Sequence, residues 1–192
     1  MEKIFNLLLL PLLMSATLSF FITPIVIKYA KKLKIIDDPK LNKHPKVIHT
    51  VPTPRGGGIP IFIAILVISF IFIPLDKHLI SILLGAFVIF IMGFLDDKYN
   101  LNPYLRLGLG AIAALIPISS GIGISFLTNP LGGIIDLSNP LISDLFALIW
   151  IVFMMNILNM GAKGIDGQLS GVTIISALTI TALSFVYSAD IT

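Results

Sequence analysis

Six long stretches without charged residues constrain what this chain can fold into. They span residues 4–27, 56–75, 79–95, 107–135, 145–162 and 167–189. A helix of about 20 apolar residues crosses the core of a bilayer, so each stretch is long enough, or nearly so, for one membrane-spanning helix. The chain is 56% hydrophobic and 12% charged, whereas soluble domains carry about 25% charged residues. The sequence therefore predicts an all-α, polytopic transmembrane helical bundle of about six spans, forming a single domain over residues 1–192.

The first and fourth stretches differ from the others. The first could be taken for a signal peptide, but it continues to Ile27 without a clear small-residue cleavage site, so we interpret it as a retained span. The fourth is longer than one helix requires. We expect a helix near 107–127 and then a turn-rich outer loop, because Asn, Pro and Gly residues gather there. The chain has no cysteine, which excludes a disulfide framework, a thiolate nucleophile and a Cys-based metal site.

The basic residues predict how the bundle is oriented. With six spans, loops 28–55, 96–106 and 163–166 share one face, and together they hold 11 of the 13 Lys and Arg residues. The positive-inside rule makes that face cytoplasmic and places the N-terminus outside. Five of the ten acidic residues and two of the three histidines lie in the same loops. We therefore expect a multi-pass protein of the cell membrane whose polar chemistry is gathered on its cytoplasmic face.

Two adjacent carboxylates, Asp96 and Asp97, follow directly on the third uncharged stretch. Adjacent carboxylates suit a hard divalent cation such as Mg²⁺, or a base beside one. The alternative is a solvated helix end in which Lys98 is the counterion. Aspartate at a helix C-terminus opposes the helix dipole, and ionisable groups beside membrane segments are functional by default, so the pattern favours a functional pair.

A basic, glycine-rich loop precedes the second uncharged stretch. Lys46, His49 and Arg55 carry positive charge suited to phosphate oxygens. The glycines at 56–58 allow close backbone approach and can offer N–H groups to an anion. The alternative is a basic juxtamembrane loop that fixes the topology and contacts anionic lipid headgroups.

A third group of polar residues lies at the end of the fifth uncharged stretch and just after it. Asn156 and Asn159 are three residues apart, hence on one face of a helix. Asn159 could give its amide oxygen to a metal ion, and Asp166, followed by Gly167, could accept hydrogen bonds from a nucleobase. The alternative is that both asparagines bridge neighbouring helices, because amides in an apolar helix need partners.

These three groups, in this order between these spans, resemble the polyprenyl-phosphate N-acetylhexosamine-1-phosphate transferase superfamily (glycosyltransferase family 4). The resemblance extends to its phospho-N-acetylmuramoyl-pentapeptide transferase-like and undecaprenyl-phosphate N-acetylglucosamine-1-phosphate transferase-like branches. Residues 49–57 resemble the family's His–Pro–Gly loop, residues 93–98 its Asp-Asp motif, and residues 156–167 its Asn-x-x-Asn motif with the following Asp-Gly. The third match departs from the family in carrying one extra residue after Met160, and Lys163 stands where the family has its first aspartate.

The resemblance implies transfer of an N-acetylhexosamine-1-phosphate from a UDP-sugar to a polyprenyl phosphate, with Mg²⁺ as cofactor and UMP as product. In that interpretation Asp96 is the base or the organiser of the lipid phosphate, and Asp97 supports the metal or that base. The remaining roles are a metal ligand in Asn159, phosphate contacts in His49, Arg55 and Lys46, and further substrate contacts in Asn156, Asp166 and Gly167, the last two at the uridine.

The family has ten or eleven spans, so the chain is expected to correspond to the N-terminal part of a longer protein. Partners implied by the resemblance are the two substrates and membrane lipid, with a homodimer as an open possibility and no nucleic acid. Two other interpretations stay open. A cation-coupled transporter subunit predicts ionisable residues near the membrane midplane, whereas here they cluster at the ends of the stretches. A non-catalytic scaffold or degenerate fragment needs no site at all.

Overall fold

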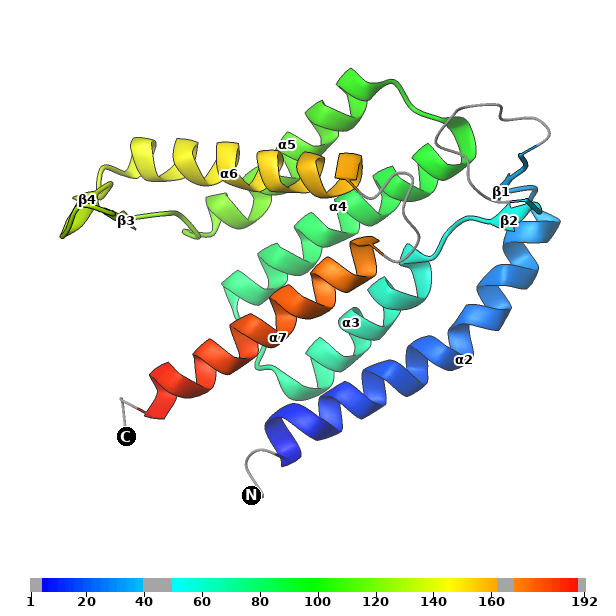
Figure 1. The fold of residues 1–192 in the computed structure, drawn as a ribbon, viewed down its shortest axis with the longest axis horizontal. Helices are drawn as coiled ribbons and strands as arrows, with labels where there is room; N and C mark the ends of the chain where they lie inside the picture. The colour runs from blue at the N-terminus through cyan, green and yellow to red at the C-terminus, as the bar shows by residue number, and fades with distance from the viewer. Residues whose placement is uncertain (1–4, 40–49, 162–167, 190–192) are drawn as a thin grey trace.

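The computed structural model describes residues 5–39, 50–161 and 168–189 of the 192-residue chain. In these ranges the chain forms six α-helices, one π-helical turn and two small antiparallel sheets (Figure 1). The helical elements are η1 (Phe5–Leu9), α2 (Leu10–Lys32), α3 (Gly58–Phe72), α4 (Lys77–Tyr99), α5 (Pro103–Ser119), α6 (Pro140–Gly161) and α7 (Gln168–Ala189). The strands are β1 (Ile36–Asp37), β2 (Thr53–Pro54), β3 (Phe126–Thr128) and β4 (Ile134–Asp136). The predicted all-α class, with one helix for each uncharged stretch, is confirmed.

Length and surface composition mark the bundle as a membrane protein. Helices α2, α4 and α6 are long and apolar enough to cross a membrane, whereas α3, α5 and the apolar part of α7 are shorter. Large apolar side chains cover the outside of the bundle; Phe20 and Phe21 of α2 are 73% and 66% exposed. Contiguous apolar surface of this kind is unfavourable in water. Exposing apolar side chains to lipid chains carries no such free-energy cost, so these side chains indicate a lipid-facing surface.

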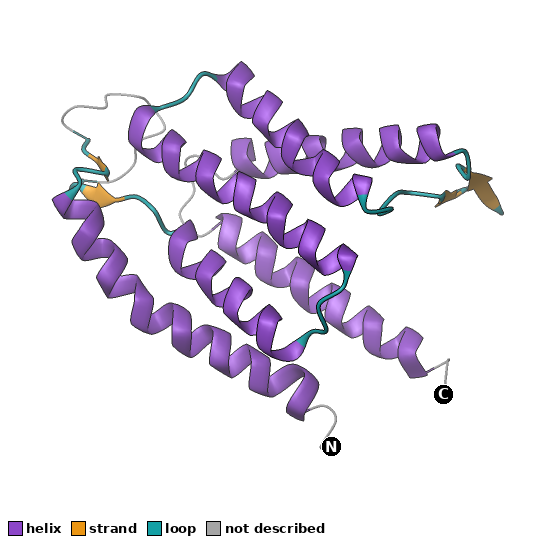
Figure 2. Cartoon of the chain, turned by 180° about the vertical axis from the view of Figure 1, so that it is seen from behind, coloured by secondary structure: helices purple, strands orange, loops and turns teal. Residues whose placement is uncertain are grey.

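Helices that follow one another in the chain pack against one another, from α2 on α3 through to α6 on α7. In both views the axes of α2, α3, α4 and α7 lie nearly parallel, with α3 and α7 running opposite to α2 and α4, whereas α6 crosses them at an angle (Figures 1 and 2). This arrangement gathers the C-terminal end of α4 and the N-terminal ends of α3 and α7 at one end of the bundle. The polar residues of interest lie at that end.

The contact between α4 and α5 is especially close at one glycine. A Cβ atom built on Gly85 would lie 2.7 Å from the carbonyl oxygen of Ala113 and 3.3 Å from Cδ of Pro117. Pro117 has no N–H to offer the carbonyl four residues earlier, which is that of Ala113. Because Gly85 has no side chain, the backbone of α4 can approach this carbonyl directly, as small residues allow at membrane helix contacts. The contact fixes α4 relative to α5.

The end of α5 differs from the sequence expectation. The helix ends at Ser119, so the expected continuation to residue 127 is wrong. The physical reason is a stop signal just beyond it: Gly121 has a φ of 100°, and its N–H donates to the carbonyl of Ile118 at 2.9 Å. A glycine in the left-handed region is a common helix terminator. The expected turn-rich loop contains a hairpin in which Phe126 of β3 pairs with Asp136 of β4.

Five helix ends extend past the uncharged stretches. Helix α2 continues to Lys32, α4 begins at Lys77 and ends at Tyr99, α5 begins at Pro103 and α6 begins at Pro140. At α5 the side chain of Asn102 accepts a hydrogen bond from the N–H of Tyr104 at 2.9 Å and caps the helix. Charged residues can occupy the terminal turns of such helices because their long side chains reach the polar interface. Arg106 is thereby placed in the first turns of α5 rather than in a loop.

Candidate active site

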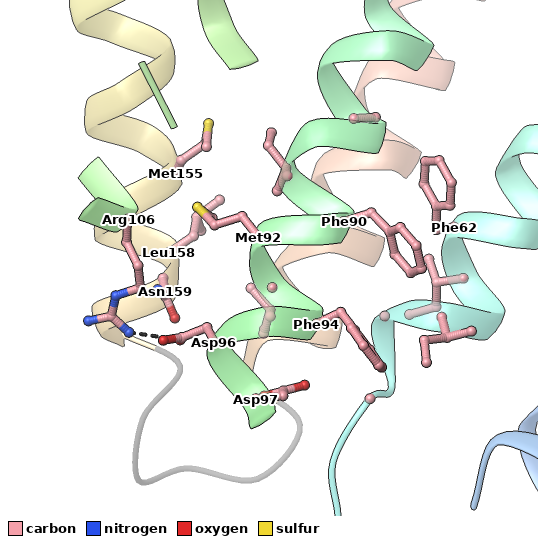
Figure 3. Close-up of a pocket in the computed structure, with 18 of the residues that line it drawn as sticks. Phe62, Phe90, Met92, Phe94, Asp96, Asp97, Arg106, Met155, Leu158 and Asn159 are labelled. Atoms are coloured by element: carbon pink, nitrogen blue, oxygen red, sulfur yellow. Dashed lines mark hydrogen bonds and ion pairs between the residues drawn. The ribbon is translucent and has the colours of Figure 1, made fainter. Parts of the chain in front are cut away.

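A cavity of about 560 Å³ lies at the end of the bundle where α4 meets α3, α5 and α6 (Figure 3). Its polar end is formed by Asp96, Asp97, Arg106 and Asn159, with the backbone of Gly56 alongside. The rest of the wall is apolar and comes from α3, α4, α6 and the first turn of α7. Its aromatic part includes Phe62 and Phe90, whose rings stack with centroids 4.6 Å apart, and Phe94.

Asp96 is held by partners on both carboxylate oxygens. Oδ1 accepts from the N–H of Leu101 at 2.9 Å, and Oδ2 forms an ion pair with Arg106 at 2.9 Å. Asn100, in the left-handed conformation at a φ of 51°, turns the chain back, and its N–H donates to the Asp96 carbonyl at 2.8 Å. The turn between α4 and α5 is therefore folded around this carboxylate.

Asp97 faces a different set of neighbours. Figure 3 shows its side chain pointing away from the Asp96–Arg106 pair. It is half-buried and lies near the backbone N–H of Gly56 and within electrostatic reach of Arg55. Gly56 has a φ of 99°, which glycine adopts without strain. In the structure this glycine lies beside a carboxylate of the protein, and the expected approach of the glycine loop to a ligand stays a prediction.

Arg55 connects Asp97 to the segment before the second helix. Its guanidinium forms an ion pair with Asp37 at 3.0 Å, and its N–H donates to the carbonyl of Ile35 at 3.0 Å. The same two segments pair as β1 and β2, with Asp37 opposite Thr53. Of the three basic residues predicted to contact phosphate, Arg55 is therefore the one that the structure places near the acidic pair among the described residues.

The two asparagines of α6 occupy different positions. Asn159 lines the cavity near Asp96 and Arg106 (Figure 3). The side chain of Asn156 instead donates to the carbonyl of Val152, one turn earlier in the same helix, at 2.8 Å, and Asn156 is not part of the cavity wall. The structure thus brings Asn159 to the acidic pair and leaves the substrate contact of Asn156 as a prediction.

Four predicted site residues, Lys46, His49, Asp166 and Gly167, lie outside the described residues. Their roles stay predictions. The structure adds two residues that the sequence analysis did not place in the site, Asp37 and Arg106. The sequence signal that could have found Arg106 is Asn102-Pro103, a pattern typical of a helix start. It would place Arg106 in the first turn of a helix, where a cation opposes the helix dipole and benefits from a carboxylate partner.

The donor set at the polar end can be tested for its fit to a divalent cation. Within the described ranges no group of three or more His, Cys, Asp or Glu side chains is positioned to hold a metal ion. Available oxygen donors are the carboxylate of Asp97, the amide of Asn159 and a carboxylate in Asp96 already shared with Arg106. Mg²⁺ is usually bound by one or two protein carboxylates, with waters and substrate phosphates as its other ligands. In residue type these donors fit Mg²⁺, although the Asp97 side chain points away from the Asp96–Arg106 pair, beside which Asn159 lies (Figure 3).

Comparison with known proteins places the chain in a family. Residues 79–191 match glycosyl transferase family 4. The chain is 30% identical over 173 residues to a probable undecaprenyl-phosphate N-acetylglucosaminyl 1-phosphate transferase of Bacillus subtilis, covering 85% of this chain and 44% of the relative. It is 29% identical over 173 residues to an undecaprenyl-phosphate alpha-N-acetylglucosaminyl 1-phosphate transferase of Thermotoga maritima, covering 90% and 52%.

A relative of another kind also matches. The chain is 31% identical over 192 residues to a phospho-N-acetylmuramoyl-pentapeptide-transferase of Caldicellulosiruptor bescii, covering 92% of this chain and 58% of the relative. The chain spans about half the length of the curated relatives it matches. No solved structure matches with significance. The matches confirm the resemblance inferred from the three motifs: the chain belongs to glycosyl transferase family 4.

Proposed function

We propose that the chain takes part in transferring an N-acetylhexosamine-1-phosphate from a UDP-sugar to a polyprenyl phosphate, with release of UMP. The activities for which the relatives are named support this reaction class. The observation that carries the proposal is the cavity, whose charged end holds two carboxylates and an arginine and whose remaining wall is apolar. A phosphate attached to an apolar tail needs both kinds of surface in one place.

The reacting end of the cavity is proposed to face the cytoplasm. Seven described basic residues lie at that end of the bundle or on the segments leading to it: Lys28, Lys31, Lys32, Lys34, Arg55, Lys98 and Arg106. The positive-inside rule assigns such a face to the cytoplasm, where UDP-sugars are available. The ends of helices at the interface let a soluble nucleotide meet a membrane-embedded lipid.

The two carboxylates have different proposed roles. Asp96 has a partner on each oxygen, so the geometry favours it as an organiser that holds Arg106 at the cavity rather than as a free base. Asp97 forms no ion pair with another described residue and lies within electrostatic reach of Arg55, so it is the carboxylate with capacity left for a metal ion or a substrate proton. Of the two roles predicted for Asp96, base or organiser of the lipid phosphate, the ion pair favours the second, which Asp96 would perform through Arg106.

The proposed reaction is a displacement at phosphorus. An oxygen of the lipid phosphate forms a bond to the sugar-bearing phosphorus of the UDP-sugar, and the bond from that phosphorus to the UMP oxygen breaks. Phosphoryl transfer relies on alignment and charge neutralisation more than on covalent help. Asp97 and Asn159 would hold Mg²⁺, which supplies that neutralisation when bound. Arg106 and Arg55 would align phosphate oxygens at the polar end.

A transporter is less well supported by the residues present. In α2, α4 and α6 every charged residue lies within about two turns of a helix end, and none lies in the middle. Ion-translocating proteins place ionisable groups near the midplane. The distribution favours interfacial chemistry.

The test is UMP release by membranes containing the chain, supplied with UDP-N-acetylglucosamine, undecaprenyl phosphate and Mg²⁺. Asp97→Asn is expected to lose release, and Asp136→Asn is the matched control because Asp136 is an exposed carboxylate in the β3–β4 hairpin. Release that persists in Asp97→Asn, or no release from folded protein with any UDP-N-acetylamino sugar, would contradict the proposal.

A further inference from the structure

Four lysines lie within seven residues at the C-terminal end of α2: Lys28, Lys31, Lys32 and Lys34. All four are exposed, and within the described ranges none of them forms an ion pair. Ala30 is 5% exposed and faces the bundle, and Lys28 and Lys32, two residues to either side of it, lie on the opposite face of the helix. The lysines therefore point outward, at a helix end whose dipole favours cations.

An apolar crevice of about 210 Å³ lies beside these lysines, on the flank of α2. Its α2 wall consists of Ile25, Val26, Tyr29, Ala30 and Leu33, and the opposite wall includes Ile59 and Phe94. Arg55 is the charged residue in its lining. Tyr29 and Leu33 are 57% and 53% exposed, so the crevice opens on the lipid-facing surface of the bundle.

Helical spacing connects the two features. Lys28 lies three residues after Ile25, and Lys32 lies three residues after Tyr29, so each lysine neighbours a residue of the crevice on the helix surface. Lysine stems lie along apolar surface while the ammonium group stays at the polar interface. A cationic cluster thus sits directly at the interfacial end of an apolar crevice.

We infer that this crevice and its lysines bind an anionic phospholipid, with the phosphate headgroup at Lys28 and Lys32, the positive charge of Lys31 nearby, and an acyl chain along Ile25 and Tyr29. Charge complementarity selects an anionic over a neutral lipid, since each basic residue near a membrane surface attracts anionic lipid by an amount equivalent to roughly a fivefold preference. The site adjoins the candidate active site, because Ile59 and Phe94 line both spaces. The inference holds whether or not the chain transfers sugar phosphates.

The experiment uses tryptophan fluorescence of the full chain in neutral-lipid bilayers. The native Trp150 is replaced by Phe, and Ile25→Trp places the reporter in the crevice. Phosphatidylglycerol and phosphatidylcholine with the same brominated acyl chains are then titrated as quenchers. We expect phosphatidylglycerol to reach half-maximal quenching at a concentration at least fivefold lower. The matched control reporter is Ile71→Trp, an exposed position near the other end of α3, where both lipids should quench alike.

Substitution of the lysines completes the test. Lys28, Lys31 and Lys32 changed together to Gln should remove the preference, changed together to Arg they should keep it, and Lys77→Gln should leave it unchanged. Equal quenching by both lipids at Ile25→Trp, or a preference that survives the triple Gln variant, would overturn the inference. Displacement of phosphatidylglycerol by equimolar undecaprenyl phosphate would also overturn it, by assigning the crevice to a polyprenyl lipid.

Discussion

Replacing Gly85 with Ala should destabilise the bundle, although alanine is the better helix former. The new Cβ would lie 2.7 Å from the Ala113 carbonyl oxygen, a backbone atom that cannot rotate away. Overpacking of this kind costs about 1–3 kcal/mol, and the gain in helix propensity returns up to about 1 kcal/mol. We expect Gly85→Ala to lower the free energy of unfolding by about 1 kcal/mol.

Gly108→Ala is the matched control, since Gly108 lies in α5 with no atom within 4 Å of an added Cβ. This variant should gain up to about 1 kcal/mol from propensity alone. A difference of about 2 kcal/mol between the variants corresponds to roughly 4–8 °C in Tm for a chain of this size. Thermal unfolding in detergent, followed by circular dichroism, measures it. A Gly85→Ala protein as stable as Gly108→Ala would refute the close α4–α5 contact.

Three further variants test the polar end of the cavity. Arg106→Gln leaves Asp96, a partly buried carboxylate, without its ion-pair partner, so it should destabilise the protein by about 1–3 kcal/mol. Adding Asp96→Asn should recover part of that loss in the same melts, and no recovery would argue against the pair. Gly56→Ala forces alanine to a φ of 99°, which should lower the stability by about 1–2 kcal/mol. A Tm equal to that of the wild type would contradict this expectation. Asp97→Asn should abolish UMP release while leaving Tm within a few degrees, and a large fall in Tm would mark Asp97 as structural.

Much of the fold could be predicted from the sequence because hydrophobic run length alone sets the number of helices in a membrane. Each of the six uncharged stretches contains one helix. The ends were less predictable, since charge content does not determine where a helix stops. Gly121 stops α5 eight residues before the expected end, and Asn102 with Pro103 starts it four residues early.

The site was predictable in its residue types but not in its pairings. Asp96, Asp97 and Asn159, which the sequence pattern singles out, all line the polar end of the cavity. That Asp96 pairs with Arg106, and that Arg55 pairs with Asp37, depends on turns whose conformation a single sequence does not specify. Asn156 shows the converse: helical spacing placed it on the face of Asn159, yet its amide bonds to its own helix.

The central claim is that the site transfers a sugar together with its phosphate. The most direct measurement supplies UDP-N-acetylglucosamine labelled with ³²P in the β-phosphate, the one bonded to the sugar, together with undecaprenyl phosphate and Mg²⁺. After incubation with membranes containing the chain, the label is counted in the lipid and aqueous phases. The account predicts label in the lipid phase that disappears in Asp97→Asn. Label that remains on UDP while the sugar moves to lipid would contradict it.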